Sequence, residues 1–113
     1  MKVAIIGSRG IDCVDFSSYL PKETTLIISG GAKGVDTLAE AYAKQKALPV
    51  LIIKPDYQKY GKNAPLIRNR KIVDIADAIL AFWDGESHGT IYTVKYAIKH
   101  NKPVRLFRKK FRP

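Results

Sequence analysis

Apolar residues in this chain follow two alternating patterns. Short runs rich in Val, Ile and Leu, typical of buried strands, alternate with longer segments in which apolar residues recur at helical spacing. The runs occupy residues 2–6, 24–29, 49–53, 78–82 and 103–107. The helical segments occupy residues 33–47, 64–75 and 89–100. A short helix capped by Asp12 is also expected to reach Tyr19. The pattern therefore predicts β-strands that alternate with helices.

The expected strands are apolar on both faces, as in a parallel sheet that helices cover on both sides. Repeated β–α units with short connections favour a doubly wound α/β sheet. The apolar sides of the last two helices should include Ile75 and Ile98. Only residues 54–65, KPDYQKYGKNAP, form a long connection, which we predict to be irregular. Loops of that length often act as lids or binding loops.

The length and composition suit one globular domain. The chain has 113 residues, of which 46% are hydrophobic, and we assign residues 1–107 to the domain and 108–113 to a basic tail. No apolar stretch approaches the roughly 20 residues of a bilayer span. The single cysteine, Cys13, is interpreted as a structural thiol rather than a nucleophile. We therefore expect a cytoplasmic protein without a membrane partner.

The charge is strongly basic. The formal net charge is +10 and the pI is near 9.8, a balance that favours anionic partners such as nucleotides or nucleic acid. Between Lys102 and Pro113 the chain has six Lys or Arg residues and no acid. This basic end is either a solvated tail that aids solubility or a contact for a phosphate backbone.

Three of the strand-to-helix junctions are rich in glycine and hydroxyl groups. They read GSRG at 7–10, SGGAKGVD at 29–36 and WDGESHGT at 83–90. The carboxyl ends of parallel strands meet at one edge of the sheet, where such folds bind ligands, so the junctions should converge. Glycine-rich turns that open a helix expose N–H groups to an anion. The convergence predicts a ligand that carries phosphate.

Side chains with ligand chemistry lie in or near these junctions. Arg9 and Arg68 suit bidentate contact with a phosphate. Asp36 either accepts a ribose hydroxyl or stabilises the helix start by its charge. Trp83 either stacks on a base or lies at the edge of the core. His88 is a proton shuttle, a phosphate donor or simply a loop residue.

The glycine spacing matches neither of two common nucleotide motifs. It is not G-x-G-x-x-G and not G-x-x-x-x-G-K-[ST], which disfavours a dinucleotide dehydrogenase and a P-loop NTPase. No group of His, Cys, Asp and Glu has metal-ligand spacing. We therefore predict no metal and no resident cofactor apart from a nucleotide-type ligand.

Four segments, VAIIGSRG, ISGGAKGVDTLAEAYA, IRNRK and ADAILAFWDGESHGT, resemble the SLOG superfamily of nucleotide-recognition proteins. The likeness is close to the YspA/YpsA-like family, which shows GSR, a GGA-G-D motif, an RN pair and a terminal GT. It implies a Rossmann-like doubly wound, mostly parallel five-stranded sheet with helices on both faces, and a homodimer. With the junctions, these motifs predict a ligand- and phosphate-binding set: Gly7, Ser8, Arg9, Ser29, Gly30, Gly31, Ala32, Gly34, Asp36, Arg68, Asn69, Trp83, Asp84, His88, Gly89 and Thr90.

Two related families suggest other activities. The Rossmann core of DprA, which loads recombinase on single-stranded DNA, has SGGARGID and RNR segments similar to residues 29–36 and 68–70 here. LOG-type phosphoribohydrolases carry PGG-x-GT-x-x-E, whereas this chain lacks the PGG and has Thr93 at the glutamate position. A carboxylate there would stabilise an oxocarbenium-like centre, so its absence disfavours N-glycosidic cleavage.

We therefore predict a domain that binds, and senses, a nucleotide or an NAD- or ADP-ribose-like derivative. The alternative is a DprA-like single-stranded DNA-binding protein that uses the same loops and the basic tail. In that reading Tyr57, Tyr60 or Trp83 stacks on bases. A further alternative is a nucleotide N-glycosidic hydrolase of the LOG type, for which the sequence identifies no catalytic residue.

Overall fold

The computed structural model describes residues 1–12 and 14–108, so the predictions for Cys13 and for tail residues 109–113 lie outside the described residues. No helix in these two ranges is long and apolar enough to cross a membrane. Each strand and each long helix that the sequence pattern predicts is present. The elements are β1 (Lys2–Gly7), the 3-10 helix η1 (Phe16–Ser18), β2 (Leu26–Ser29), α1 (Val35–Gln45), β3 (Val50–Ile52), α2 (Tyr57–Tyr60), η2 (Gly61–Asn63), α3 (Ala64–Ile75), β4 (Ala78–Trp83), α4 (His88–Lys99) and β5 (Val104–Arg108).

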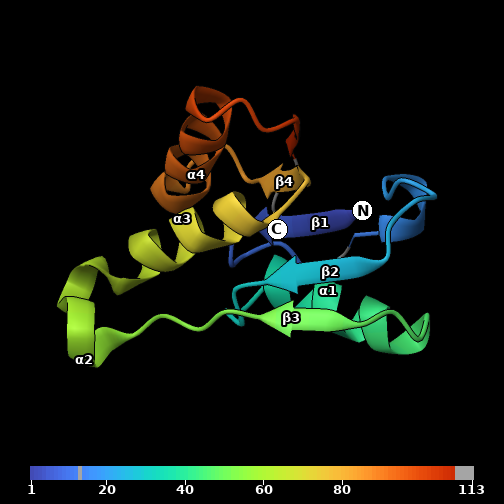
Figure 1. The fold of residues 1–113 in the computed structure, drawn as a ribbon, viewed down its shortest axis with the longest axis horizontal. Coiled ribbons are helices and arrows are strands. Elements are labelled where there is room, and N and C mark those ends of the chain that lie inside the picture. Colours follow the sequence, from blue (N-terminus) through green and yellow to red (C-terminus); the bar gives the residue numbers. More distant parts are fainter. Residues whose placement is uncertain (13, 109–113) are drawn as a thin grey trace.

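The strands form one five-stranded parallel sheet in the order β3-β2-β1-β4-β5 (Figure 1). The chain first adds strands on one side of β1 and then returns to add β4 and β5 on the other. This order confirms the Rossmann-like doubly wound fold. Such sheets bind ligands where the order reverses, here beyond the carboxyl ends of β1 and β4. Gly7 is paired with Phe82, so the loops after these two strands begin side by side.

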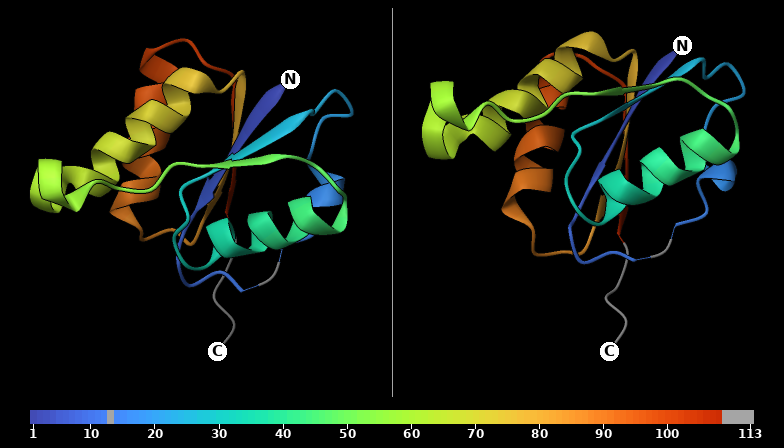
Figure 2. Two further views of the ribbon diagram at one scale, coloured as in Figure 1. Left: turned by 60° about the horizontal axis from the view of Figure 1, so that its bottom comes forward. Right: turned by 90° about the horizontal axis from the view of Figure 1, so that it is seen from below.

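Alternate residues of β1 pack on opposite faces of the sheet. Val3 and Ile5 belong to the core under α1 and η1, while Ala4 and Ile6 belong to the core under α3 and α4. Figure 2 shows the sheet between these two helical layers. Both faces of β1 are therefore shielded from water, which explains its uninterrupted apolar sequence.

The structure corrects two local predictions. Asp15, not Asp12, caps the first helical segment, because its carboxylate accepts the Ser17 N–H at 3.2 Å and holds a single 3-10 turn. The connection at 54–65 is not wholly irregular, since α2 and η2 lie within it. Asp56 accepts the Lys59 N–H at 3.1 Å and so provides the N-cap of α2.

The buried sides of α3 and α4 also differ from the predicted ones. Ile75 is 37% exposed and Ile98 is 61% exposed, although both were expected on apolar sides. Arg68, Thr90 and Thr93 are buried instead. These polar residues line a cavity, so part of each helix faces a polar pocket rather than the apolar core. Hydrophobic spacing alone cannot indicate such a face.

Candidate functional site

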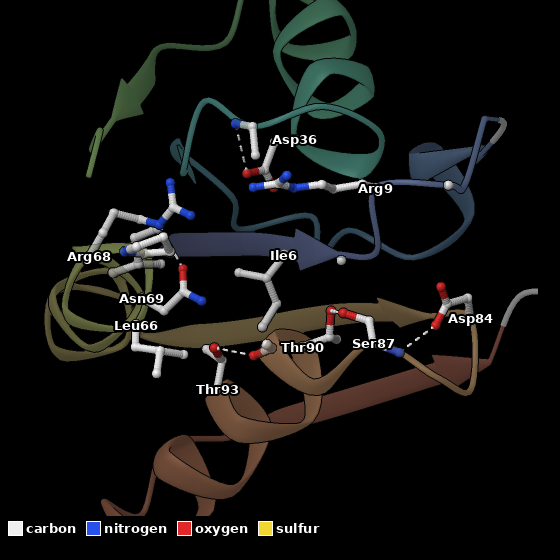
Figure 3. A pocket seen from close by; sticks show the side chains of 16 residues that line it. Ile6, Arg9, Asp36, Leu66, Arg68, Asn69, Asp84, Ser87, Thr90 and Thr93 are labelled. Carbon is white, nitrogen blue, oxygen red and sulfur yellow. Dashed lines mark hydrogen bonds between the residues drawn. The ribbon is translucent and has the colours of Figure 1, made fainter. Parts of the chain in front are cut away.

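A cavity of about 470 Å³ lies beyond the carboxyl ends of β1 and β4, between α1, α3 and α4 (Figure 3). Its size falls within the range of small-molecule sites. The lining combines polar and apolar side chains. It comprises Ile6, Gly7, Arg9, Gly10, Ala32, Asp36, Pro65, Leu66, Arg68, Asn69, Ile72, Asp84, Ser87, Gly89, Thr90 and Thr93.

The loop after β1 brings Arg9 to this cavity. Ser8 is buried, and its hydroxyl accepts the N–H of Asp84 at 3.1 Å, which ties this loop to the one after β4. The next residue, Arg9, is exposed, and its side chain extends across the cavity near Asp36 (Figure 3). Arg9 therefore presents a guanidinium to any ligand that enters.

The turn after β2 is filled by protein atoms. A Cβ placed on Gly30 would lie 2.7 Å from Nη1 of Arg68 and 2.9 Å from Oδ2 of Asp36. A Cβ placed on Gly34, whose φ is +77°, would lie 2.4 Å from the carbonyl oxygen of Arg9. Oδ2 of Asp36 also accepts the Ala32 N–H at 3.1 Å. These glycines thus allow close contacts within the protein, and Asp36 supplies the negative charge at the start of α1.

Asp36 and Arg68 are two buried, oppositely charged side chains that both lie beside Gly30 in the β2–α1 turn. Burial raises the pKa of the Asp36 carboxyl, and the Ala32 N–H and the Arg68 charge offset only part of this effect. Burial also lowers the pKa of the Arg68 guanidinium, which Asp36 opposes. Arg68 remains charged at neutral pH because a guanidinium does not lose its proton in proteins.

Arg68 also orients the neighbouring amide. Its Nη1 donates to the carbonyl oxygen of Gly30, which links α3 to the β2–α1 turn. Its Nε donates to Oδ1 of Asn69 at 2.7 Å. This bond uses the amide oxygen of Asn69 and leaves its NH₂ group to donate into the cavity (Figure 3).

The start of α4 is built differently from that of α1. Oδ1 of Asp84 accepts the N–H groups of Glu86 and Ser87, each at 2.8 Å, and so shapes the turn. Burial opposes the ionisation of Asp84, but these N–H groups together with the Ser8 side chain and the Asp84 backbone outweigh it and lower the pKa of the carboxyl. Ser87, the N-cap residue, makes no side-chain cap, and the space around a Cβ on Gly89 is open. The positive end of α4 thus faces the cavity beside open space.

Thr93 occupies the position at which LOG-type enzymes carry a glutamate. It is buried and lines the cavity, and its hydroxyl donates to the carbonyl oxygen of Gly89 at 2.8 Å. The position therefore provides no carboxylate. Two carboxylates do line the cavity, Asp36 and Asp84, and each of them already holds backbone N–H groups.

The structure brings nine of the sixteen predicted residues to the cavity lining: Gly7, Arg9, Ala32, Asp36, Arg68, Asn69, Asp84, Gly89 and Thr90. The other seven lie nearby but outside the lining: Ser8, Ser29, Gly30, Gly31, Gly34, Trp83 and His88. Nε1 of Trp83 donates to the carbonyl oxygen of Ser87 at 2.9 Å, so this indole braces the β4–α4 turn. His88 is exposed in the first turn of α4.

Sequence reasoning missed the apolar wall of the cavity, which consists of Ile6, Pro65, Leu66 and Ile72. Ile6 and Ile72 carry no signal that distinguishes them from core residues, and both belong to the core under α3 and α4. Pro65 and Leu66 lie in the first turn of α3, a helix that could be placed against the sheet only once its packing was known. Gly10 and Ser87 lie within predicted junctions but outside the predicted set.

The cavity lining is therefore chemically mixed. Arg9, Asn69 and the start of α4 offer cationic and N–H groups, and Asp36 offers a carboxylate. Ile6, Pro65, Leu66 and Ile72 add apolar surface. In residues 1–12 and 14–108 no group of three or more His, Cys, Asp and Glu could hold a metal ion. The arrangement suits an organic anion with hydroxyl groups and a flat apolar part.

The fold and the cavity define an α/β domain with a ligand pocket at the switch point of a parallel sheet. The chain belongs to the YspA, cpYpsA-related SLOG family (YAcAr), whose family model matches residues 1–60. It is also 34% identical over 85 residues to the Gene 61 protein of Mycobacterium phage D29, an alignment that covers 70% of this chain and 68% of the phage protein. No solved structure matches the chain.

Proposed function

We propose that this domain binds a nucleotide or an NAD- or ADP-ribose-like derivative in the cavity beyond β1 and β4. The observation that carries the proposal is the open N-terminus of α4 opposite Arg9, in a cavity of about 470 Å³ whose lining also includes apolar residues. Membership of the SLOG family supports a nucleotide-related ligand.

Each part of such a ligand has a suitable partner. A phosphate would lie at the start of α4, where Gly89 and Thr90 approach the cavity and the Arg9 guanidinium adds a charge-assisted donor. The carboxylate of Asp36 would accept ribose hydroxyl groups, and the Asn69 amide would donate to an acceptor. A base or another flat ring would lie on Leu66 and the apolar wall.

The alternative functions receive less support from the cavity. Tyr57, Tyr60 and Trp83, the residues expected to stack on DNA bases, do not line it, and Trp83 is hydrogen-bonded to Ser87. The hydrolase alternative lacks a carboxylate at Thr93. The sensor role and the homodimer stay predictions, and light scattering would test the dimer.

A thermal-shift titration tests the proposal with AMP, ADP-ribose, NAD and cyclic nucleotides as ligands. A ligand that binds only the folded state raises the melting temperature by mass action. We expect one nucleotide to do so at both low and moderate salt. Arg9→Ala should weaken its affinity by about 10- to 100-fold, the range for a hydrogen bond to a charged group.

The matched control is Lys33→Ala, which removes the same charge from an exposed residue of the β2–α1 turn that does not line the cavity. We expect this variant to bind like the wild type. Equal losses in both variants would show that only net charge attracts the ligand. If none of these nucleotides shifts the melting temperature, the proposal is wrong.

A further inference from the structure

A second groove lies on the outer side of the α3–α4 layer. It has a volume of about 380 Å³ and is lined by Arg70 from α3 and by Tyr92, Lys95, Tyr96, Lys99 and His100 from α4 and its C-cap. We call it the α3–α4 groove. It shares no lining residue with the cavity beyond β1 and β4. The groove and the cavity are therefore formed by different residues.

The sequence of α4 places tyrosine and lysine on one helical stripe. Tyr92, Lys95, Tyr96 and Lys99 are separated by three, one and three residues, a spacing that keeps them on one face. The helix sequence, HGTIYTVKYAIK, contains no Asp or Glu. Lys95 and Lys99 are exposed and lie about 6 Å apart along the helix axis, given a rise of about 1.5 Å per residue.

The aromatic residues of the groove are held by contacts with Arg70 and with one another. Nε of Arg70 donates to the hydroxyl of Tyr92 at 2.7 Å, and its guanidinium carbon lies 5.7 Å from the Tyr92 ring centroid. The same carbon lies 5.9 Å from the ring of Tyr96. The His100 ring lies 4.1 Å from that of Tyr96. The hydroxyl of Tyr96 donates to Asp74 at 3.0 Å, which fixes the ring and engages this acidic neighbour.

We propose that the α3–α4 groove binds single-stranded nucleic acid. Lys95 and Lys99 would contact successive phosphates along α4, and the cluster of Arg70, Tyr92 and Tyr96 would provide the stacking surface for unpaired bases, chiefly through the Tyr92 ring. Cations combined with stacking surfaces are the features by which proteins bind single strands without sequence preference. A duplex hides the faces of its bases and an acidic peptide has none, so neither would use the tyrosines.

The test is fluorescence anisotropy of a labelled short oligo-dT, between about 50 and 200 mM salt, with full-length variants. Lys95→Ala/Lys99→Ala should reduce the slope of log affinity against log salt by about 1.4, or about 0.7 for each lost phosphate contact. The control, Lys44→Ala/Lys46→Ala, removes two exposed lysines at the end of α1, on the opposite face of the sheet. Its slope should equal that of the wild type, and the basic tail is the same in every variant.

A second pair of variants tests stacking. Tyr92→Leu should weaken oligo-dT binding about tenfold, whereas Tyr92→Phe, which keeps the ring but loses the hydrogen bond from Arg70, should retain most of the affinity. With an abasic oligonucleotide the two variants should bind equally, because no base is present to stack. Circular dichroism and melting curves check that each variant is folded.

Three outcomes would overturn the proposal. Equal losses of oligo-dT affinity in the α4 and α1 double-lysine variants would mean that only the net charge of the protein attracts the oligonucleotide. Equal affinity for duplex DNA would remove the role of the rings, and equally strong competition by polyglutamate would indicate an acidic polypeptide instead. The Lys95→Ala/Lys99→Ala variant should keep its nucleotide thermal shift and Arg9→Ala should keep its oligo-dT affinity, so the two proposals can fail separately.

Discussion

The turns at residues 29–36 and 83–90 both join a parallel strand to a helix, and both contain glycine beside hydroxyl groups. In the first turn, side chains and backbone of the protein lie against the glycines, with Arg68 over Gly30 and the Arg9 backbone against Gly34. In the second turn, a Cβ on Gly85 would lie 2.7 Å from Nη2 of Arg108, but the space around a Cβ on Gly89, at the start of α4, is open. Glycines of similar sequence patterns therefore serve contacts within the protein at Gly30, Gly34 and Gly85, whereas Gly89 leaves a free surface.

This difference also concerns charge. The β2–α1 turn carries its own carboxylate, Asp36, which accepts the Ala32 N–H and faces the cavity. A phosphate beside it would be repelled. At the start of α4 the carboxylate of Asp84 is engaged by two N–H groups of its own turn, and Arg9 lies across the cavity. The comparison therefore assigns the phosphate to α4 and the hydroxyl groups to α1.

The largest expected effect is the loss of stability in Gly34→Ala. The new Cβ would lie 2.4 Å from the Arg9 carbonyl oxygen, in a backbone conformation with φ +77° that side chains rarely adopt. We expect the free energy of unfolding to fall by about 3 kcal/mol, from backbone strain together with displacement of the Arg9 loop. Urea denaturation would measure it. A loss below about 1 kcal/mol would mean that the β1 loop can move aside and that the close contact is not required.

The same substitution at Gly89, Gly89→Ala, should leave the stability intact but weaken nucleotide binding. A Cβ there meets no atom within 4 Å, and alanine favours a helix more than glycine does, so stability should stay the same or rise by up to about 1 kcal/mol. Nucleotide affinity should fall about tenfold, because the methyl group would occupy space beside the N–H groups at the start of α4. Calorimetric titration would measure the affinity. Unchanged affinity would return the phosphate to the β2–α1 turn.

Much of the fold could be predicted because it depends on local pattern. The apolar run at 2–6 identifies β1, and the spacing of Val35, Ala39 and Ala43 identifies the buried side of α1. The prediction fails for Ile75 and Ile98, which are exposed near the C-terminal ends of α3 and α4, where Val73 and Ala97 are buried instead. Periodicity shows which residues are apolar, but not which surface a helix presents to a pocket.

The candidate site, like the fold, could be predicted from the sequence only in part. The junction motifs locate Arg9, Asp36 and Gly89 at one edge of the sheet, because parallel strands end there together. They could not show that other residues of the protein fill the space beside Gly30 and Gly34, because those residues are distant in sequence. Arg68, beside Gly30, lies on α3, and Arg9, beside Gly34, follows β1. Nor could they identify Leu66 as part of an apolar wall, because it looks like any core residue of a helix.

The smallest expected effect is that of Asp36→Asn on how the free energy of unfolding varies with pH. The effect is small because burial and the Arg68 charge shift the pKa of this carboxyl in opposite directions. Burial prevails and raises its folded-state pKa above the ordinary 3.8, so the folded protein holds this proton more tightly than the unfolded chain. Below that ordinary pKa both states are protonated and folding is not penalised. As the pH rises toward the folded-state pKa the unfolded chain loses its proton first, so stability falls, and above it the loss stays constant.

Asparagine cannot ionise, yet its amide oxygen can still accept the Ala32 N–H. The unfolding free energy of Asp36→Asn minus that of the wild type should therefore grow as the pH rises above about 3.8 and then level off. Asp15, Asp77 and Asp84, whose pKa values are lowered, add the opposite slope to both proteins and cancel in the difference. Urea denaturation at a series of pH values measures it. A difference that shrinks with rising pH would mean that attraction to Arg68 outweighs burial. The ionised Asp36 carboxylate would then stabilise the folded protein. It would not be a buried charge that destabilises the fold and that hydrogen bonds from a ligand's hydroxyl groups could stabilise.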